Sequence, residues 1–173
     1  MKNFPVIVEG ETYWVSRSVA TAGFVFSRLD GEFYVLANRR RSGTPDFQGF
    51  WNCPCGYLDY NESLTDSCIR EILEETGIDM GICISRGAKL LRIGINEGLD
   101  TEKQNITFRF MFLDMTGNAI SQVLTDKYSE RHEVDDIKWI NIKNVDNYKW
   151  AFNHDKIIKH CINTFINNIV KPF

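Results

Sequence analysis

The segment from Gly56 to Ile78 reads GYLDYNESLTDSCIREILEETGI, and it is the most informative stretch of the sequence. Its apolar side chains recur every fourth residue, at Leu64, Cys68 and Ile72. This period predicts an amphipathic helix over residues 62–76. Asn61 is expected to cap the start of the helix, and Gly77 follows its end, where a left-handed glycine is common. The segment therefore predicts a helix that is anchored in a core by one face.

The same segment carries six carboxylates and a single arginine. On the predicted helix, Glu71, Glu74 and Glu75 fall within about 100° of one another, at 100° per residue. Like charges this close repel by some tenths of a kcal/mol per pair, so a positive partner is expected above this face. A hard cation such as Mg²⁺ prefers oxygen ligands and leaves room for water and phosphate. The pattern predicts a metal-binding face opposite the apolar anchor.

The segment resembles the signature of the Nudix hydrolase family, the Nudix box, which is Gly, five residues, Glu, seven residues, then Arg-Glu-apolar-x-Glu-Glu-x-Gly-apolar. Residues 56–78 are called the box below. All nine fixed positions agree with the spacing intact: Gly56, Glu62, Arg70, Glu71, Ile72, Glu74, Glu75, Gly77 and Ile78. Downstream, Trp139 in a predicted strand and an Ala-Phe-Asn-His run before the last predicted helix also fit the family. The resemblance implies an α/β (α+β) fold, a Nudix-type α/β/α sandwich with a central mixed β-sheet, in one domain over residues 1–173.

The resemblance also implies a metal site built from the helix carboxylates and holding Mg²⁺, with Mn²⁺ as a substitute. The implied ligands are the backbone carbonyl of Cys55 and the carboxylates of Glu71, Glu74, Glu75 and Glu133. In some members the position of Glu71 acts as the general base instead. Glu62 would support the metal shell, and Arg70 would pair with a box glutamate and orient it. Glu133 is chosen because it lies six residues before Trp139, and Glu130 is the second choice.

The reaction implied by the resemblance is hydrolysis of a diphosphate bond in a nucleoside diphosphate linked to another moiety, with water attacking phosphorus. Arg39, Arg40 and Arg41 end a predicted strand just before the box and are candidate phosphate contacts. Strand alternation places at most two of the three on one face. Many ADP-ribose hydrolases carry a proline sixteen residues past the last box glycine, but Ile93 stands there. The linked moiety is therefore not fixed by the sequence.

Two other function classes stay open. A Nudix-fold ligand sensor or regulator would bind without hydrolysis, but such proteins often lose box acids and add a DNA-binding domain. An enzyme like isopentenyl diphosphate isomerase would use a cysteine and a glutamate, which Cys53 or Cys55 could supply. The complete box favours the hydrolase over both.

The remaining elements follow from local patterns. Strands are expected over Ser18–Leu29 and Glu32–Asn38, joined by an Asp30-Gly31 turn. Further strands are expected over Ile82–Ile95, Asn105–Met115 and Val134–Ile142, with loops over 39–50, 96–104 and 116–133. A continuous apolar face predicts a C-terminal helix from His154 to Val170 that packs on the sheet.

The charge and hydropathy of the chain limit the classes of partner that we expect. The 173 residues carry 20 Lys and Arg against 23 Asp and Glu, a net charge of −3. The box alone has a charge of −5, from one base and six acids, so the rest of the chain has +2. No apolar run approaches the 18 residues of a membrane span. We expect a cytoplasmic protein that binds a small-molecule nucleoside diphosphate derivative, with no nucleic acid and no membrane as partner. Because many relatives form dimers, a homodimer is among the expected assemblies.

Overall fold

The computed structural model describes residues 4–15, 18–95, 105–124 and 133–170. Its central sheet has the strand order β5-β4-β3-β8-β7, with β6 also paired to β3 and β9 to β4. These strands are β3 (Val19–Leu29), β4 (Glu32–Arg40), β5 (Trp51–Asn52), β6 (Cys55–Tyr57), β7 (Lys89–Ile95), β8 (Ile106–Asp114) and β9 (Val134–Asn141). The sheet is mixed because β3 and β8 run parallel, whereas the other pairs are antiparallel.

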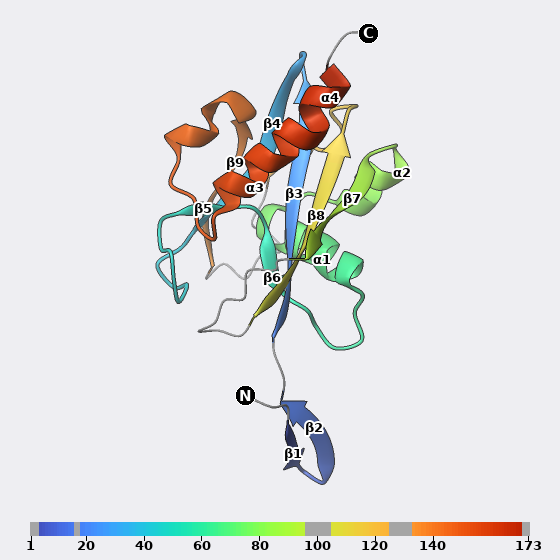
Figure 1. Ribbon diagram of the computed structural model, residues 1–173, viewed down its shortest axis with the longest axis vertical. Coiled ribbons are helices and arrows are strands. Elements are labelled where there is room, and N and C mark those ends of the chain that lie inside the picture. Colours follow the sequence, from blue (N-terminus) through green and yellow to red (C-terminus); the bar gives the residue numbers. More distant parts are fainter. Residues whose placement is uncertain (1–3, 16–17, 96–104, 125–132, 171–173) are drawn as a thin grey trace.

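Helices cover both faces of this sheet (Figure 1). They are α1 (Leu64–Thr76), α2 (Met80–Ser85), α3 (His154–Cys161) and α4 (Asn167–Val170). A 3₁₀ helix, η1 (Ile142–Asn147), follows β9, and a π-helical segment, η2 (Ile162–Ile166), joins α3 to α4. Side chains from α1 and α2 pack on one face, and those from α3 and η2 pack on the other. The expected mixed sheet with flanking helices is confirmed.

Helix α1 lies against the central strand β3 through the predicted apolar stripe. Cys68 and Ile72 are fully buried, and Ile72 packs directly over Gly23 of β3. The helix begins later than expected, because Ser63 and not Asn61 is its N-cap and accepts the N–H of Asp66 at 3.1 Å. Gly77 ends it as predicted, in the left-handed conformation, and its N–H donates to Leu73.

The strand predictions hold with three corrections. The β3–β4 hairpin turns at Asp30 and Gly31, both with positive φ, but β4 continues to Arg40, so the loop starts two residues later than expected. The strand expected over Ile82–Ile95 is wrong in its first half, because α2 occupies Met80–Ser85 and β7 begins only at Lys89. Val134–Ile142 is confirmed as β9 up to Asn141, after which the chain enters η1. The strand expected over Asn105–Met115 is β8.

The C-terminal helix is confirmed over His154–Val170, with the π-helical turn in its middle. Its buried side chains join the core on the α3 face of the sheet: Ile158, Cys161 and Ile166. The expected loop over 96–104 lies outside the described residues, as do residues 125–132 of the loop expected over 116–133. In the described part of the chain, no helix is long and apolar enough to cross a membrane.

A hairpin that was not predicted precedes the sheet. Strands β1 (Phe4–Val8) and β2 (Glu11–Val15) pair only with each other and project from one end of the molecule in Figure 1. Several of its apolar side chains are exposed: Ile7, Val8, Tyr13 and Val15.

Candidate functional site

The predicted site forms where the short strand β6 lies between β3 and α1. Gly56 on β6 faces α1 so closely that a Cβ atom there would lie 2.2 Å from Oε1 of Glu71. Gly56 does not have a positive φ, so this glycine is required by space and not by backbone conformation. Glycine at this position therefore lets a carboxylate of the helix rest against the backbone of β6.

Glu75 is held at the outer edge of the same strand. Its Oε2 accepts the backbone N–H of Cys55 and Nδ2 of Asn38, each at 3.1 Å. In an extended strand the N–H and C=O of one residue point to the same edge, so the Cys55 carbonyl also points towards this edge. Cys55 is not among the described residues with positive φ, so a side chain in place of the family's common glycine causes no backbone strain there.

The two carboxylates are in an electrostatically unfavourable position. Burial raises the pKa of Glu71 to about 7, against a partial offset from Arg70. Burial also raises the pKa of Glu75 well above its usual value, and the charge of Glu71 raises it further. Glu133, exposed just before β9, adds to both effects, which places its charge near them. Glu130, the second choice for the late-loop ligand, lies outside the described residues.

Arg70 donates hydrogen bonds to three carboxylates of the box. Its Nε and Nη2 donate to the two oxygens of Glu62, at 2.8 and 3.1 Å. Its Nη1 donates to Glu71 at 2.8 Å and to Glu74 at 2.9 Å. The hydrogen bond from Arg70 lowers the pKa of Glu62, which stays charged at neutral pH. Arg70 therefore orients three carboxylates, one in the loop before α1 and two on α1 itself.

The donor set suits a hard cation. Within the described ranges, no three His, Cys, Asp or Glu side chains lie close enough together to hold a metal ion in this arrangement. However, Oε2 of Glu71 and Oε1 of Glu75 have no hydrogen-bond partner among the described residues, and burial with like charge opposes ionisation of both groups. A divalent cation would supply the positive charge and take the oxygen ligands that these residues offer.

The three predicted phosphate contacts are engaged with other groups. Arg39 forms an ion pair with Asp135 at 2.7 Å, and Arg40 with Asp46 at 2.8 Å. The Arg40 guanidinium also lies 4.9 Å from the centre of the Phe152 ring. The backbone N–H of Arg41 donates to the carbonyl of Glu133, which ties the end of β4 to the start of β9.

Sequence reasoning missed three polar residues beneath the carboxylates. Asn38 and Asn52 are paired across β4 and β5, both are buried, and the Oδ1 atom of each has no hydrogen-bond partner in the described part of the chain. His154 is buried at the start of α3, where its Nδ1 accepts the N–H of Cys53 at 3.0 Å. The available signal was a polar residue inside an apolar strand, as Asn38 is in Val-Leu-Ala-Asn.

The cysteines near the site are unreactive thiols. Cys53 is buried and Cys55 half-buried, and neither forms a disulfide. Burial raises the pKa of both thiols, so the nucleophilic thiolate is scarce at neutral pH.

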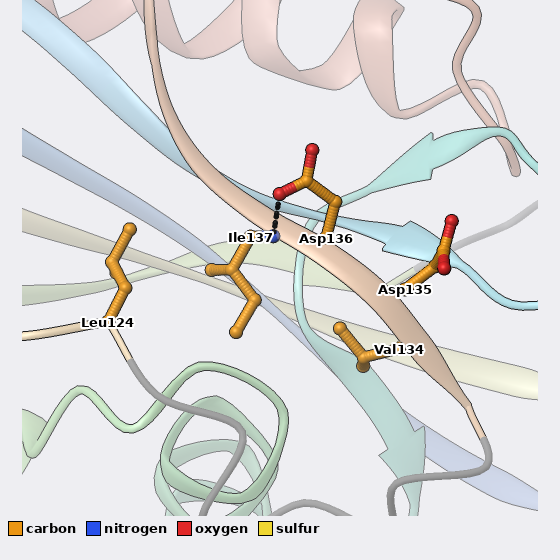
Figure 2. Close-up of a pocket in the computed structure, with 5 residues that line it drawn as sticks. All are labelled: Leu124, Val134, Asp135, Asp136 and Ile137. Atoms are coloured by element: carbon orange, nitrogen blue, oxygen red, sulfur yellow. Dashed lines mark hydrogen bonds between the residues drawn. The ribbon is translucent and has the colours of Figure 1, made fainter.

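A separate pocket lies beside β9 and is shown in Figure 2. It has a volume of about 260 Å³ and is lined by Leu124, Val134, Asp135, Asp136 and Ile137. The apolar side chains of Leu124, Val134 and Ile137 lie on one side of β9, and both aspartates lie on the other (Figure 2). The aspartates are paired with Arg39 and Lys138, and no box glutamate lines the pocket. The pocket is therefore distinct from the carboxylate site.

Known proteins with similar sequences include a Nudix hydrolase and an mRNA-decapping enzyme. Nudix hydrolase 8 of Arabidopsis thaliana is 30% identical over 39% of this chain and 21% of its own length. The mRNA-decapping enzyme subunit 2 of Saccharomyces cerevisiae is 25% identical over 70% of this chain and 10% of its own length. The chain thus spans about a fifth or less of the length of these two relatives.

A similar fold occurs in the NUDIX domain of Shewanella oneidensis NrtR, solved in complex with ADP ribose. Its TM-score is 0.68 at 20% identity, over 86% of this chain and 88% of that one. The NUDIX domain family model matches residues 17–161, which include the whole sheet, α1 and α3. The match begins after the β1–β2 hairpin. The box signature, the mixed sheet between helices and this match together establish that the chain belongs to the NUDIX domain family.

Proposed function

We propose that this chain is a divalent-metal-dependent pyrophosphohydrolase that cleaves a nucleoside diphosphate linked to another moiety. The observation that carries the proposal is the pair of carboxylates held against Cys55 and Gly56 of β6, the buried one of Glu75 and the partly buried one of Glu71. Diphosphate hydrolysis depends on positioning and on charge stabilisation more than on covalent help from the protein.

Mg²⁺ or Mn²⁺ would be held by the ligands implied by the resemblance: the Cys55 carbonyl, Glu71, Glu74, Glu75 and Glu133. When bound, the metal offsets the charge on phosphate oxygens and makes water easier to deprotonate. Arg70 and Glu62 would orient Glu71 and Glu74 through the hydrogen bonds described above. Asn38 would hold Glu75 in place.

The general base is proposed to be one of the box glutamates. Glu71 suits this role where it acts as base instead of metal ligand, because burial raises its pKa to about 7 and it can take a proton near neutral pH. Its Oε1 is occupied by Arg70, so the proton of the attacking water would go to Oε2. The phosphate oxygens would meet Arg39, Arg40 or Arg41 only if these side chains leave their present partners.

The two other function classes are less well supported. The high thiol pKa of Cys53 and Cys55 does not suit an isomerase that needs a reactive cysteine. A regulator that binds without hydrolysis would have no need for the complete set of box carboxylates. The structure similar to this chain binds ADP ribose, but at 20% identity that likeness concerns the fold, so the linked moiety remains to be found by assay.

The test is a phosphate-release screen over nucleotide sugars, dinucleotides, nucleoside triphosphates and coenzyme A, with Mg²⁺.

Glu74→Gln and Glu75→Gln should each lower kcat by about 10²–10⁴-fold, because both remove a carboxylate from the proposed metal site. Glu11→Gln, on the exposed hairpin, is the matched control and should keep native activity. EDTA should abolish hydrolysis. Native turnover in both box variants, or full activity in EDTA, would contradict the proposal.

A further inference from the structure

Arg109, on β8, has an unusual environment for an arginine. In the part of the chain that the structure describes, its guanidinium forms no ion pair and no hydrogen bond, yet the residue is half-buried. Burial is the cause that lowers the pKa of this guanidinium, and no carboxylate of the described residues opposes it. A charged group withdrawn from water without a partner costs free energy, so a bound anion would relieve an unfavourable arrangement.

Strand register places Arg109 near the carboxylate site. Arg109 pairs with Ala22 of β3, and Ala22 pairs on its other side with Cys55 of β6. Because neighbouring strands are about 4.8 Å apart, the Cα atoms of Arg109 and Cys55 are separated by about 10 Å. Directly paired residues direct their side chains to the same face, here the face on which α3 packs. Ala22, the residue between them on this face, contributes only a methyl group and is fully buried.

Part of the Arg109 side chain reaches the surface on this face. Ala22 and Ala20, which lie between β6 and β8, are buried, but Arg109 itself is only half-buried. Tyr57 of β6 is on the same face, paired with Ala20, and 57% of its surface is exposed. A ligand bound at the outer edge of β6 can therefore contact Tyr57 and the exposed part of the Arg109 side chain.

Two arginines contribute positive charge on this face. The charges of Arg109 and Arg40 both lower the pKa of His154, so two guanidinium groups act on the same point. His154 is itself neutral, because its Nδ1 accepts the N–H of Cys53, and its remaining proton sits on Nε2 as a donor. Arg40 is already paired with Asp46, whereas Arg109 has no acidic partner among the residues that the structure describes.

We propose that Arg109 binds a phosphate group of the substrate on the α3 face of the sheet, beside Cys55. The inference rests on the proposed function and deepens it, because it names the anchor for the part of the substrate that extends beyond the carboxylates. Arg109 binds and positions the substrate, and it takes no part in the chemical step. Of the arginines near the site, it is the one whose charge the described residues leave uncompensated, whereas Arg39 and Arg40 have acidic partners.

The test is a calorimetric titration of the full chain with the methylene analogue of ADP, which cannot be hydrolysed between its phosphates, in the presence of Mg²⁺. Arg109→Met should weaken binding by about 10- to 100-fold, because it removes a charged hydrogen bond to phosphate. Arg109→Lys should restore part of the affinity. Arg92→Met is the matched control, since Arg92 is exposed on β7 and lies over Phe108 on the opposite face of the sheet. It should change the affinity by less than twofold.

Two further readouts separate binding from a structural role. Adenosine lacks phosphate, so any binding of adenosine should be the same in the native protein and in Arg109→Met. Thermal unfolding of Arg109→Met should occur at the native temperature or higher, because the variant removes a half-buried charge that has no partner among the described residues. The proposal is overturned if the native protein shows no saturable binding, if Arg109→Met binds as the native protein does, or if Arg92→Met weakens binding equally.

Failure of this inference is distinguishable from failure of the proposed function. The titration needs no turnover, so it reports on Arg109 even if the phosphate-release screen finds no hydrolysis. Conversely, hydrolysis with native affinity in Arg109→Met would keep the proposed function and remove the anchor.

Discussion

Gly56 shows how one residue without a side chain controls the site. Alanine at this position would place its Cβ 2.2 Å from Oε1 and 2.3 Å from Cδ of Glu71, so the whole carboxylate must move. We expect Gly56→Ala to lower kcat by about 100-fold, because a displacement of about 1 Å at a reacting centre has an effect of that size. The measurement is steady-state hydrolysis with the substrate that the screen identifies.

The matched control for this variant is Gly81→Ala on α2, where the nearest neighbour of an added Cβ is the side chain of Asp79 at 3.1 Å. It should leave hydrolysis at the native rate. Equal activity of Gly56→Ala and the native protein would show that Glu71 does not need its place against β6.

His154 makes stability depend on pH. Burial lowers the pKa of His154 to about 3, whereas an unfolded histidine titrates near 6.5. Its contribution to stability is therefore fully present above pH 6.5 and is lost as the pH falls from 6.5 towards 3. The variant His154→Gln keeps an acceptor for the Cys53 N–H. The difference in free energy of unfolding between the native protein and this variant should fall by about 1.4 kcal/mol per pH unit below 6.5. Urea unfolding at pH 7.5, 6 and 5 measures it, and a difference that is constant with pH would refute this account.

At the residue level, the box could be predicted from the sequence, but the residues that hold its carboxylates in place could not. The spacing of Glu71, Glu74 and Glu75 predicted one shared face, but local pattern cannot show that Arg70 bonds two of them. The cap was assigned to Asn61 because Asn and Ser are both good N-caps two positions apart. Asn61 instead takes a left-handed φ of 60° in the loop before the helix. Arg109 and Asn38 were missed because their significance depends on neighbours distant in sequence.

The contact between α1 and β3 sets the distance of α1 from the sheet. A Cβ on Gly23 would lie 2.6 Å from Cδ1 of Ile72, so Gly23→Ala should destabilise the protein by about 1–3 kcal/mol through overpacking. Ile72→Val removes Cδ1 and alone should cost about 0.5–1.5 kcal/mol. The double variant should be more stable than the sum of the single effects predicts, because Val leaves room for the new methyl group. Denaturant unfolding of all four proteins measures the coupling.

Ile7→Ala is the control for this cycle, since 75% of the surface of Ile7 is exposed on the hairpin. It should change stability by less than about 0.5 kcal/mol and show no coupling to Gly23→Ala. Strict additivity of Gly23→Ala and Ile72→Val would mean that the helix shifts as a body instead of repacking locally.

At the level of elements, periodic segments were predicted well and short apolar runs were not. The α1 stripe and the long apolar face of the C-terminal helix extend over several turns, so their period was unambiguous. Met80–Ser85 is too short for a helical period to be distinguished from the start of a strand, and the strand expected from Ile82 onwards includes its last four residues. Strand β6 has three residues and carries Gly56, so its sequence shows none of the β-branched enrichment that marks longer strands.

The uneven distribution of charge concerns the whole molecule. The box has a charge of −5 in a chain whose remainder has +2, and burial opposes ionisation of two of its carboxylates, Glu71 and Glu75. A divalent cation should therefore stabilise the folded chain, by about 2.7 kcal/mol at 100 times Kd. This corresponds to a rise of about 5–10 °C in Tm for a domain of this size. Scanning calorimetry with and without Mg²⁺ measures the shift.

Glu75→Gln should lose most of the shift, while Glu11→Gln on the hairpin should keep it. The same shift with K⁺ at equal ionic strength, or an undiminished shift in Glu75→Gln, would indicate general screening instead of a bound cation.

The central position of β3 has a consequence for how the chain is made. Its parallel partner β8 begins with Ile106 opposite Val19, 87 positions later in the chain. When the ribosome has completed β3, β4, β6 and the box helix, one edge of β3 still has no neighbour, and its buried phenylalanines Phe24 and Phe26 lie beside that open edge. An unpaired apolar strand edge is a template for association with other chains. The interval of translation between the box helix and β8 is therefore the period in which the nascent protein most needs protection from aggregation.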